Sequence, residues 1–236
     1  MKLQEIFDQL SYGEFADLDL GNRNDGGIRV EDYPKIVPHI NIALTALYKR
    51  FTLAYDEVYI QQYDHISTYY LDNKYAVTNT SSTEPIKYIQ DSVYKPFSAD
   101  QLIKIERVFS EVGDELYTND DNTFSSVYTP TYNTIQVPHP VNDNAMRVIF
   151  TKGHDKIVLT GLDPNTTNVD IPISYLEPLL YYVASRVFAG MTGVDSQNQS
   201  NNYMSKYELS CQEIERLNLT QKDNTTNLRL EINGWV

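Results

Sequence analysis

The sequence predicts an α+β fold: a helical bundle built from N- and C-terminal helices, an inserted small antiparallel β domain, and an extended C-terminal arm. Apolar residues recur at helical spacing near both ends of the chain, whereas short β-branched and aromatic stretches fill its middle. A polar linker then precedes an alternating tail. The predicted boundaries are 1–54 for the N-terminal helices, 55–172 for the β domain, 173–220 for the C-terminal helices and 221–236 for the arm.

Two helices are expected before the β domain. A short one runs from Leu3 to Leu10, and a longer one covers 34–51, where apolar residues recur every three or four positions. Pro34 suits a first helical turn, although Pro38 leaves open a later start. The glycine-rich stretch over 21–27 predicts a turn or loop between the two helices.

The middle of the chain predicts short strands. Segment 98–112 is ambiguous, because Ser98 to Gln101 fits a helix capping box while the following apolar residues alternate as in a strand. The alternation favours a strand for this segment. Further strands are expected around 58–70, at Tyr132–Val137, at Arg147–Phe150 and at Lys156–Leu159, the last two joined by a turn at 152–154.

Two more helices are expected after the β domain. One begins near residue 175, where Ser174 and Glu177 fit a capping box, or where Glu177 caps the helix with Pro178 at its first position. The last helix covers about 197–217. Beyond it, Leu228–Ile232 alternates like a strand, which is unstable alone. It must join this chain's own sheet or add to another chain, and physics alone leaves both open.

Composition limits the function. The 236 residues include 19 Lys and Arg against 32 Asp and Glu, a net charge of −13. This acidity argues against a basic stripe for nucleic acid and against an anionic membrane surface. No apolar run is long enough for a membrane span, and the N-terminus has no signal peptide, so a cytosolic origin is expected. The 19 tyrosines supply apolar area with a polar tip, typical of surfaces that a partner buries.

No recognisable catalytic or metal-binding motif occurs, so we expect a non-enzymatic protein with no cofactor and no metal. The four histidines share no ligand spacing, and the acidic loop 118–123 lacks the glycine and glutamate of an EF-hand. Cys211 lies on the apolar side of its helix, where a buried small side chain is expected. The tyrosines of the last two helices are expected in the bundle core: Tyr181, Tyr182, Tyr203 and Tyr207.

Four stretches carry a resemblance to a known family. They are Tyr12–Gly21 with the helix His39–Phe51, then Leu102–Val108 with Gly113–Leu116 and Asn119-Asp120, then Thr131–Pro138, and finally Ile171-Pro172 with Leu179–Val187 and Asn201–Cys211. In this order and spacing they span most of the chain, which resembles the head-to-tail adaptor proteins of short-tailed bacteriophages, relatives of the tail tubular and portal-adaptor proteins.

The resemblance implies a ring, typically of twelve copies, below the portal in the virion neck, assembled in the host cytoplasm. The ring would connect the portal protein to the tail nozzle or tail fibres and continue the DNA channel without binding DNA specifically. The helices would form the ring wall, the β domain would face tail proteins, and the arm would reach the portal. The implied portal-interface residues are Leu228, Arg229, Leu230, Ile232, Trp235 and Val236.

Other functions fit the sequence less well. The nearest alternative is another neck or tail-attachment ring protein, such as a head-completion stopper. A cell-wall-degrading tail hydrolase is much less favoured, because no spacing singles out a pair of carboxylates. A host regulatory binding module has no charge or motif signal in its favour.

Overall fold

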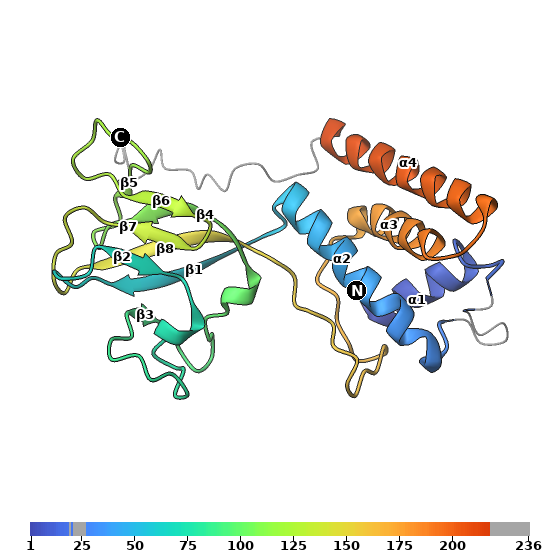
Figure 1. The fold of residues 1–236 in the computed structure, drawn as a ribbon, viewed down its shortest axis with the longest axis horizontal. Coiled ribbons are helices and arrows are strands. Elements are labelled where there is room, and N and C mark those ends of the chain that lie inside the picture. The colour runs from blue at the N-terminus through green and yellow to red at the C-terminus, as the bar shows by residue number, and fades with distance from the viewer. Residues whose placement is uncertain (19, 21–26, 218–236) are drawn as a thin grey trace, which may run out of the picture. The chain divides into compact units, whose positions relative to one another are not determined.

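The computed structural model describes residues 1–18, 20 and 27–217. The fold is mixed α+β, with N-terminal helices, central antiparallel sheets, and a C-terminal helix pair that packs against an N-terminal helix (Figure 1). The chain forms two compact units. The helical unit combines Met1–Thr52 with the chain from Lys156 onward, and the β unit is Leu53–Asp155.

The two predicted N-terminal helices are present, as α1 (Leu3–Tyr12) and α2 (Tyr33–Phe51). A short 3-10 turn, η1 (Val30–Asp32), leads into α2, which begins ahead of Pro38. Asp32 is buried at this start and accepts hydrogen bonds from Lys35 Nζ at 2.6 Å and Arg29 Nε at 2.9 Å. A carboxylate here also interacts favourably with the helix dipole, which helps to fix where α2 begins.

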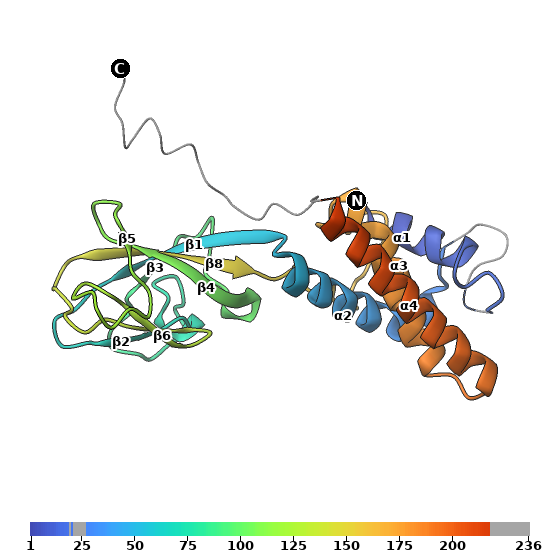
Figure 2. The same cartoon turned by 90° about the horizontal axis from the view of Figure 1, so that it is seen from above.

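The two predicted C-terminal helices are also present. They are α3 (Leu176–Ala189), which follows the turn η4 (Ile173–Tyr175), and α4 (Val194–Arg216). α3 is the central helix of this unit because it packs against α1, α2 and α4. Both views of the ribbon place α4 alongside α3 (Figures 1 and 2).

The predicted strand Lys156–Leu159 is wrong, because this stretch is irregular and belongs to the helical unit. Asn41 of α2 supplies the reason. Its side-chain amide donates to the carbonyl of Ile157, and its oxygen accepts from the Ile157 N–H, both at 2.9 Å. One side chain therefore satisfies the backbone that a strand partner would have paired. The sequence placed the end of the β domain at 172, whereas the compact β unit ends at Asp155.

The β unit contains two antiparallel sheets. The larger sheet has the order β3-β1-β8-β4-β5 and the smaller one β2-β7-β6. The strands of the larger sheet are β1 (Ala54–Gln61), β3 (Ile89–Gln90), β4 (Leu102–Phe109), β5 (Glu115–Leu116) and β8 (Ala145–Lys152). Those of the smaller sheet are β2 (Thr68–Tyr70), β6 (Tyr128–Thr131) and β7 (Thr134–Gln136). Both sheets contribute to a single apolar core.

The ambiguous segment 98–112 contains the predicted strand, β4, preceded by a single 3-10 turn, η3 (Ala99–Gln101). Ser98 makes no capping hydrogen bond through its side chain, so the capping-box pattern does not start an α-helix. The predicted strand at Tyr132–Val137 is shorter, because Tyr132 and Asn133 form the turn between β6 and β7. Arg147–Phe150 lies within β8, as predicted.

Candidate functional site

The six residues that the resemblance places at a portal interface lie outside the described residues. They are Leu228, Arg229, Leu230, Ile232, Trp235 and Val236. The described residues offer other candidate sites on the surface of each unit.

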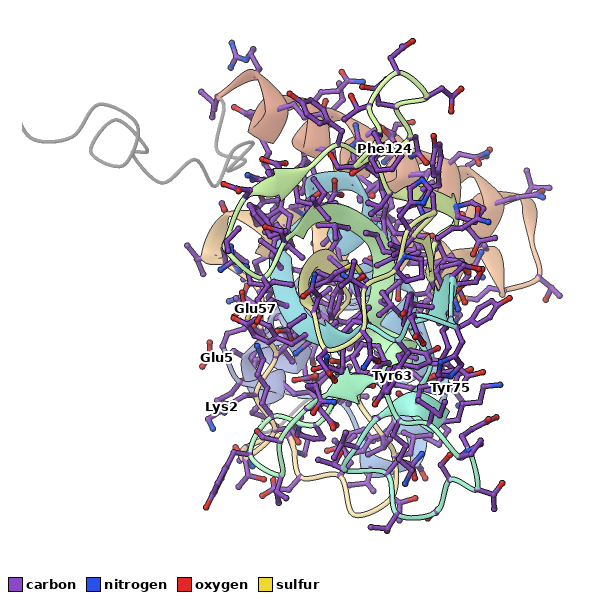
Figure 3. All side chains as sticks on the ribbon, turned by 90° about the vertical axis from the view of Figure 1, so that its left-hand side faces the viewer. Lys2, Glu5, Glu57, Tyr63, Tyr75 and Phe124 are labelled. Atoms are coloured by element: carbon purple, nitrogen blue, oxygen red, sulfur yellow. The ribbon has the colours of Figure 1, made fainter. Side chains whose placement is uncertain are left out.

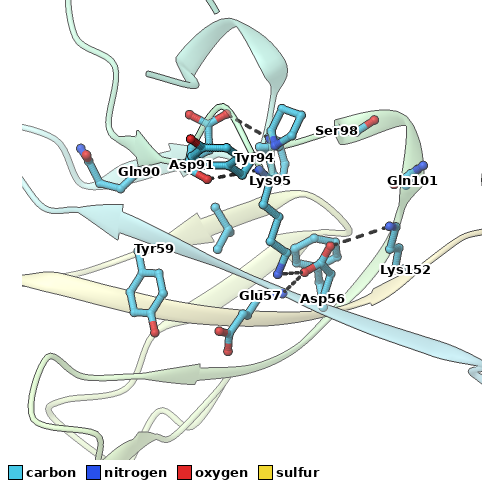
Figure 4. Close-up of a pocket in the computed structure, with 15 residues that line it drawn as sticks. Asp56, Glu57, Tyr59, Gln90, Asp91, Tyr94, Lys95, Ser98, Gln101 and Lys152 are labelled. Carbon is cyan, nitrogen blue, oxygen red and sulfur yellow. Dashed lines mark hydrogen bonds and ion pairs between the residues drawn. The ribbon is translucent and has the colours of Figure 1, made fainter. Parts of the chain in front are cut away.

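The β unit carries a groove of about 470 Å³ beside β1. β1 and β8 form one side of it, and the chain between β3 and η3 forms the other (Figure 4). Apolar side chains line part of the groove, among them Val58, Phe97 and Phe150. Charged side chains line the rest of the groove, among them Asp56, Lys95 and Lys152.

The charges of the groove pair with one another. Asp56 forms ion pairs with Lys95 and, at 3.9 Å, with Lys152 (Figure 4). Asp91 accepts hydrogen bonds from the hydroxyl of Thr78, from the N–H of Thr78 at 2.9 Å and from the N–H of Phe97 at 3.0 Å. Burial raises the pKa of Asp91, but these hydrogen bonds outweigh burial and hold the pKa below its ordinary value. Asp91 thus stays charged, and both carboxylates are engaged by groups of the same unit, which fits positioning of the loop rather than acid–base catalysis.

The loops of the β unit expose large apolar side chains. Tyr94 is fully exposed beside the groove, Val112 is 84% exposed between β4 and β5, and Phe124 is 80% exposed between β5 and β6. Phe124, labelled in Figure 3, stacks on the ring of His139 with 4.3 Å between the ring centres. Single exposed apolar residues are ordinary, but exposed apolar residues in adjoining loops, such as those that carry Val112 and Phe124, are typical of a surface that a partner covers.

The helical unit exposes apolar side chains of its own. The most exposed lie at the end of α1 (Tyr12), in the turns before α2 and α3 (Val30 and Ile173), and in α4 (Val194 and Leu209). Each unit therefore presents apolar surface independently of the other.

A polar cluster joins the segment after α1 to α3 and α4. Glu177 accepts from the Tyr181 hydroxyl at 2.9 Å, and the Lys206 ammonium lies over the rings of Tyr181 and Tyr203. The buried Oε2 of Glu14 has no hydrogen-bond partner among the described residues, and burial raises the pKa of this carboxyl. Glu14 and Glu177 are thus neighbouring carboxyl groups. Glu177 accepts hydrogen bonds from the hydroxyls of Tyr181 and Ser210, which is typical of a structural network and not of a catalytic pair.

Arg50, near the end of α2, binds α4 through two carboxylates. Its guanidinium donates to Glu208 at 2.8 Å and to Glu215 at 2.9 Å. The two glutamates are seven residues apart, so they lie on one face of α4 two turns apart. This network was not predicted, although the spacing of the two glutamates and the basic end of the 34–51 helix are visible in the sequence.

The predicted histidines and tyrosines do not form a site. His65 and His139 are exposed, and burial lowers the pKa of the half-buried His39. Within the described ranges, no three His, Cys, Asp or Glu side chains are placed to hold a metal ion. Tyr207 is buried, in agreement with a place in the core, whereas the other three predicted core tyrosines are half-buried: Tyr181, Tyr182 and Tyr203. Among the helices described, none is both long and apolar enough to cross a membrane.

Cys211 is fully buried against Tyr207, as the helical pattern predicted. Burial raises the pKa of its thiol to about 11, and the thiolate is the reactive form. We expect iodoacetamide at mildly alkaline pH to leave Cys211 unmodified in the native protein and to alkylate it fully in urea, as read by intact mass. Rapid alkylation of the native protein would contradict this packing of α4.

No family model and no curated protein matches the chain.

Proposed function

We propose that the chain is a structural protein of the virion neck, the head-to-tail adaptor of a short-tailed bacteriophage. It forms a ring below the portal, in about twelve copies as the resemblance implies, and connects the portal to the tail nozzle or tail fibres. It catalyses no reaction and binds no cofactor. It assembles in the host cytoplasm and ends in the virion.

One observation carries this proposal: both units expose large apolar side chains on their own surfaces. A ring requires heterologous contacts, in which one patch of a subunit meets a different patch of the next. The loops that carry Val112 and Phe124 supply one patch, and Tyr94 lies in a separate loop beside the groove. The exposed residues around Ile173 and α4 supply apolar surface on the helical unit.

The net charge of −13 supports the same proposal. A channel that DNA must traverse functions best when its wall does not hold phosphate, and carboxylates repel phosphate. We therefore assign part of the acidic surplus to the lumen of the ring. In this arrangement the helices form the wall, the β unit faces tail proteins, and the arm that carries Trp235 engages the portal.

The test combines the purified protein with portal-containing heads that lack their neck. We expect the protein alone to be monomeric by mass photometry, and electron microscopy to show a ring on the portal after mixing. A variant ending at residue 220 should stay folded and fail to join these heads. Normal joining by the truncated variant would refute the role of the arm.

The full chain tests the function itself. Absence of any ring or binding on portal-containing heads would overturn the adaptor role, and a basic channel in the assembled ring would overturn the acidic lumen. A clearing zone on a peptidoglycan zymogram would instead indicate the hydrolase alternative.

A further inference from the structure

β1 has one fully paired edge and one partly open edge. On one side it pairs with β8 along its whole length, from Ala54 to Gln61. On the other side it pairs with β3 only at Tyr59 and Ile60. The part of this edge before Tyr59 has no strand partner among the described residues. It borders the groove, which lies beside β1 on the same side as β3 (Figure 4). An open strand edge beside a groove is the geometry of strand addition.

The backbone groups on this edge follow from the alternation of an antiparallel ladder. Gln61 donates its N–H to the Tyr88 carbonyl on the β3 side at 2.8 Å, so Tyr59, Glu57 and Tyr55 direct their backbone groups to the same side. The Glu57 N–H is already bound by Asp56 Oδ1 at 2.8 Å. An incoming strand therefore finds the amide of Tyr55 and the carbonyls of Tyr55 and Glu57.

The side chains around this edge define the ligand. Phe97 is half-buried, and Val58 and Phe150 are core residues that border the groove, so every second side chain of an added strand would pack over the edge of this core. The exposed carboxylate of Glu57 lies on the opposite face of β1, where Arg147 Nε is 4.0 Å away, and would favour a second cation among the intervening side chains. The matching ligand alternates apolar residues with polar ones and carries a positive charge at one of the polar positions.

The chain contains such a sequence beyond the described residues. Residues 228–232 read Leu-Arg-Leu-Glu-Ile, with three apolar residues at alternate positions and Arg229 between the first two. We propose that this segment adds as a strand to the open edge of β1 in its own chain, with its apolar side chains in the groove and Arg229 near Glu57.

The length of chain permits this contact in any orientation of the two units. Glu215 binds Arg50, so the last turn of α4 lies at the end of α2, from which the chain leads directly into β1. From Arg50 to Tyr55 the chain spans at most about 18 Å, whereas the residues from Leu217 to Leu228 reach about 39 Å when extended. The reach of residues 217–228 is therefore greater than the span of residues 50–55, and the difference also covers the length of the Arg50 and Glu215 side chains.

This contact concerns the subunit before assembly and does not rest on the proposed function. If the arm binds a portal, the β1 edge and the portal compete for it. The edge would then keep the alternating segment covered until the portal is met, and would limit pairing of the segment with other chains.

The single tryptophan, Trp235, gives a direct measurement because it lies in the arm. In the wild-type protein we expect a Trp fluorescence anisotropy well above that of a synthetic 221–236 peptide. Tyr55→Pro removes an amide that faces the groove and leaves the ladder with β8 intact, as tolerated at sheet edges. Its anisotropy should fall to the value of the peptide, while the control Tyr55→Ala, which keeps the amide, should stay near wild type.

A charge exchange tests the register independently of any effect of proline on folding. Arg229→Glu should lower the anisotropy, and the double variant Arg229→Glu with Glu57→Lys should restore it. Equal anisotropy in wild type and Tyr55→Pro, or no restoration by the double variant, would overturn the proposal. A wild-type anisotropy that falls as the protein is diluted would show that the arm binds a neighbouring copy, which also overturns the contact within one chain.

Discussion

Val148→Asp is expected to abolish folding of the β unit. Val148 is fully buried in β8, the central strand of the larger sheet, and its register partners are Val58 on β1 and Val108 on β4. Three valines thus form one row across three strands on the core face. A carboxylate in this row has no partner within reach, so it must be buried unpaired or the strands must separate. We expect a cost of roughly 4 kcal/mol or more, the range of substitutions that unfold a marginally stable domain.

The neighbouring residue provides the matched control. Arg147 precedes Val148 and points to the opposite face, where its guanidinium lies 4.6 Å from the ring centre of Phe109 and 4.0 Å from Glu57. Arg147→Ala removes only these partly exposed contacts and should cost less than about 1 kcal/mol. Urea unfolding, followed by the near-ultraviolet circular dichroism of the tyrosines, measures both. Native unfolding behaviour of Val148→Asp would show that the register of β1, β8 and β4 is wrong.

The helices and the central strands were predictable because their patterns are local. The apolar spacing along α2 and the alternation around Val148 each reflect one buried face, and such periodicity is readable without knowing the partner. The segment 156–159 has the same local character and is still not a strand. Its backbone finds Asn41, which lies more than a hundred positions earlier in the chain, and nothing in the segment itself indicates this.

The polar contacts were not predictable for the same reason. Asp56, Lys95 and Lys152 meet in the groove from three distant positions, and each alone resembles an ordinary surface charge. The bond from Arg50 to Glu208 likewise joins residues 158 positions apart. The predicted portal interface at 228–236 lies outside the described residues, so it stays a prediction. The sequence does show that apolar residues alternate over 228–232. A candidate partner for this segment is visible only in the structure, where one edge of β1 is partly open.

Phe188→Ala is expected to cost about 3–5 kcal/mol, the usual range for a buried phenylalanine. Phe188 is almost fully buried near the end of α3. Its ring stacks against Tyr203 of α4 with centres 5.5 Å apart, and it meets Phe15 edge-on at 6.5 Å. One side chain therefore ties both α4 and the segment after α1 to α3. The control Phe188→Leu keeps part of the volume and loses the aromatic contacts, so it should cost less.

The distribution of buried residues along α4 sharpens this expectation. In its first half, up to Lys206, only Ser200 is buried, and its hydroxyl donates to the Ser185 carbonyl at 2.9 Å. The second half is held by Tyr207, Cys211, Ile214 and the two carboxylates that bind Arg50. Removal of the Phe188 ring therefore leaves the first half with little apolar contact while the second half stays anchored. Amide hydrogen exchange should accelerate over 194–206 and change much less over 207–216. Equal acceleration along the whole helix would mean that α4 undocks as one unit, and that the contact with Arg50 does not hold its second half in place independently.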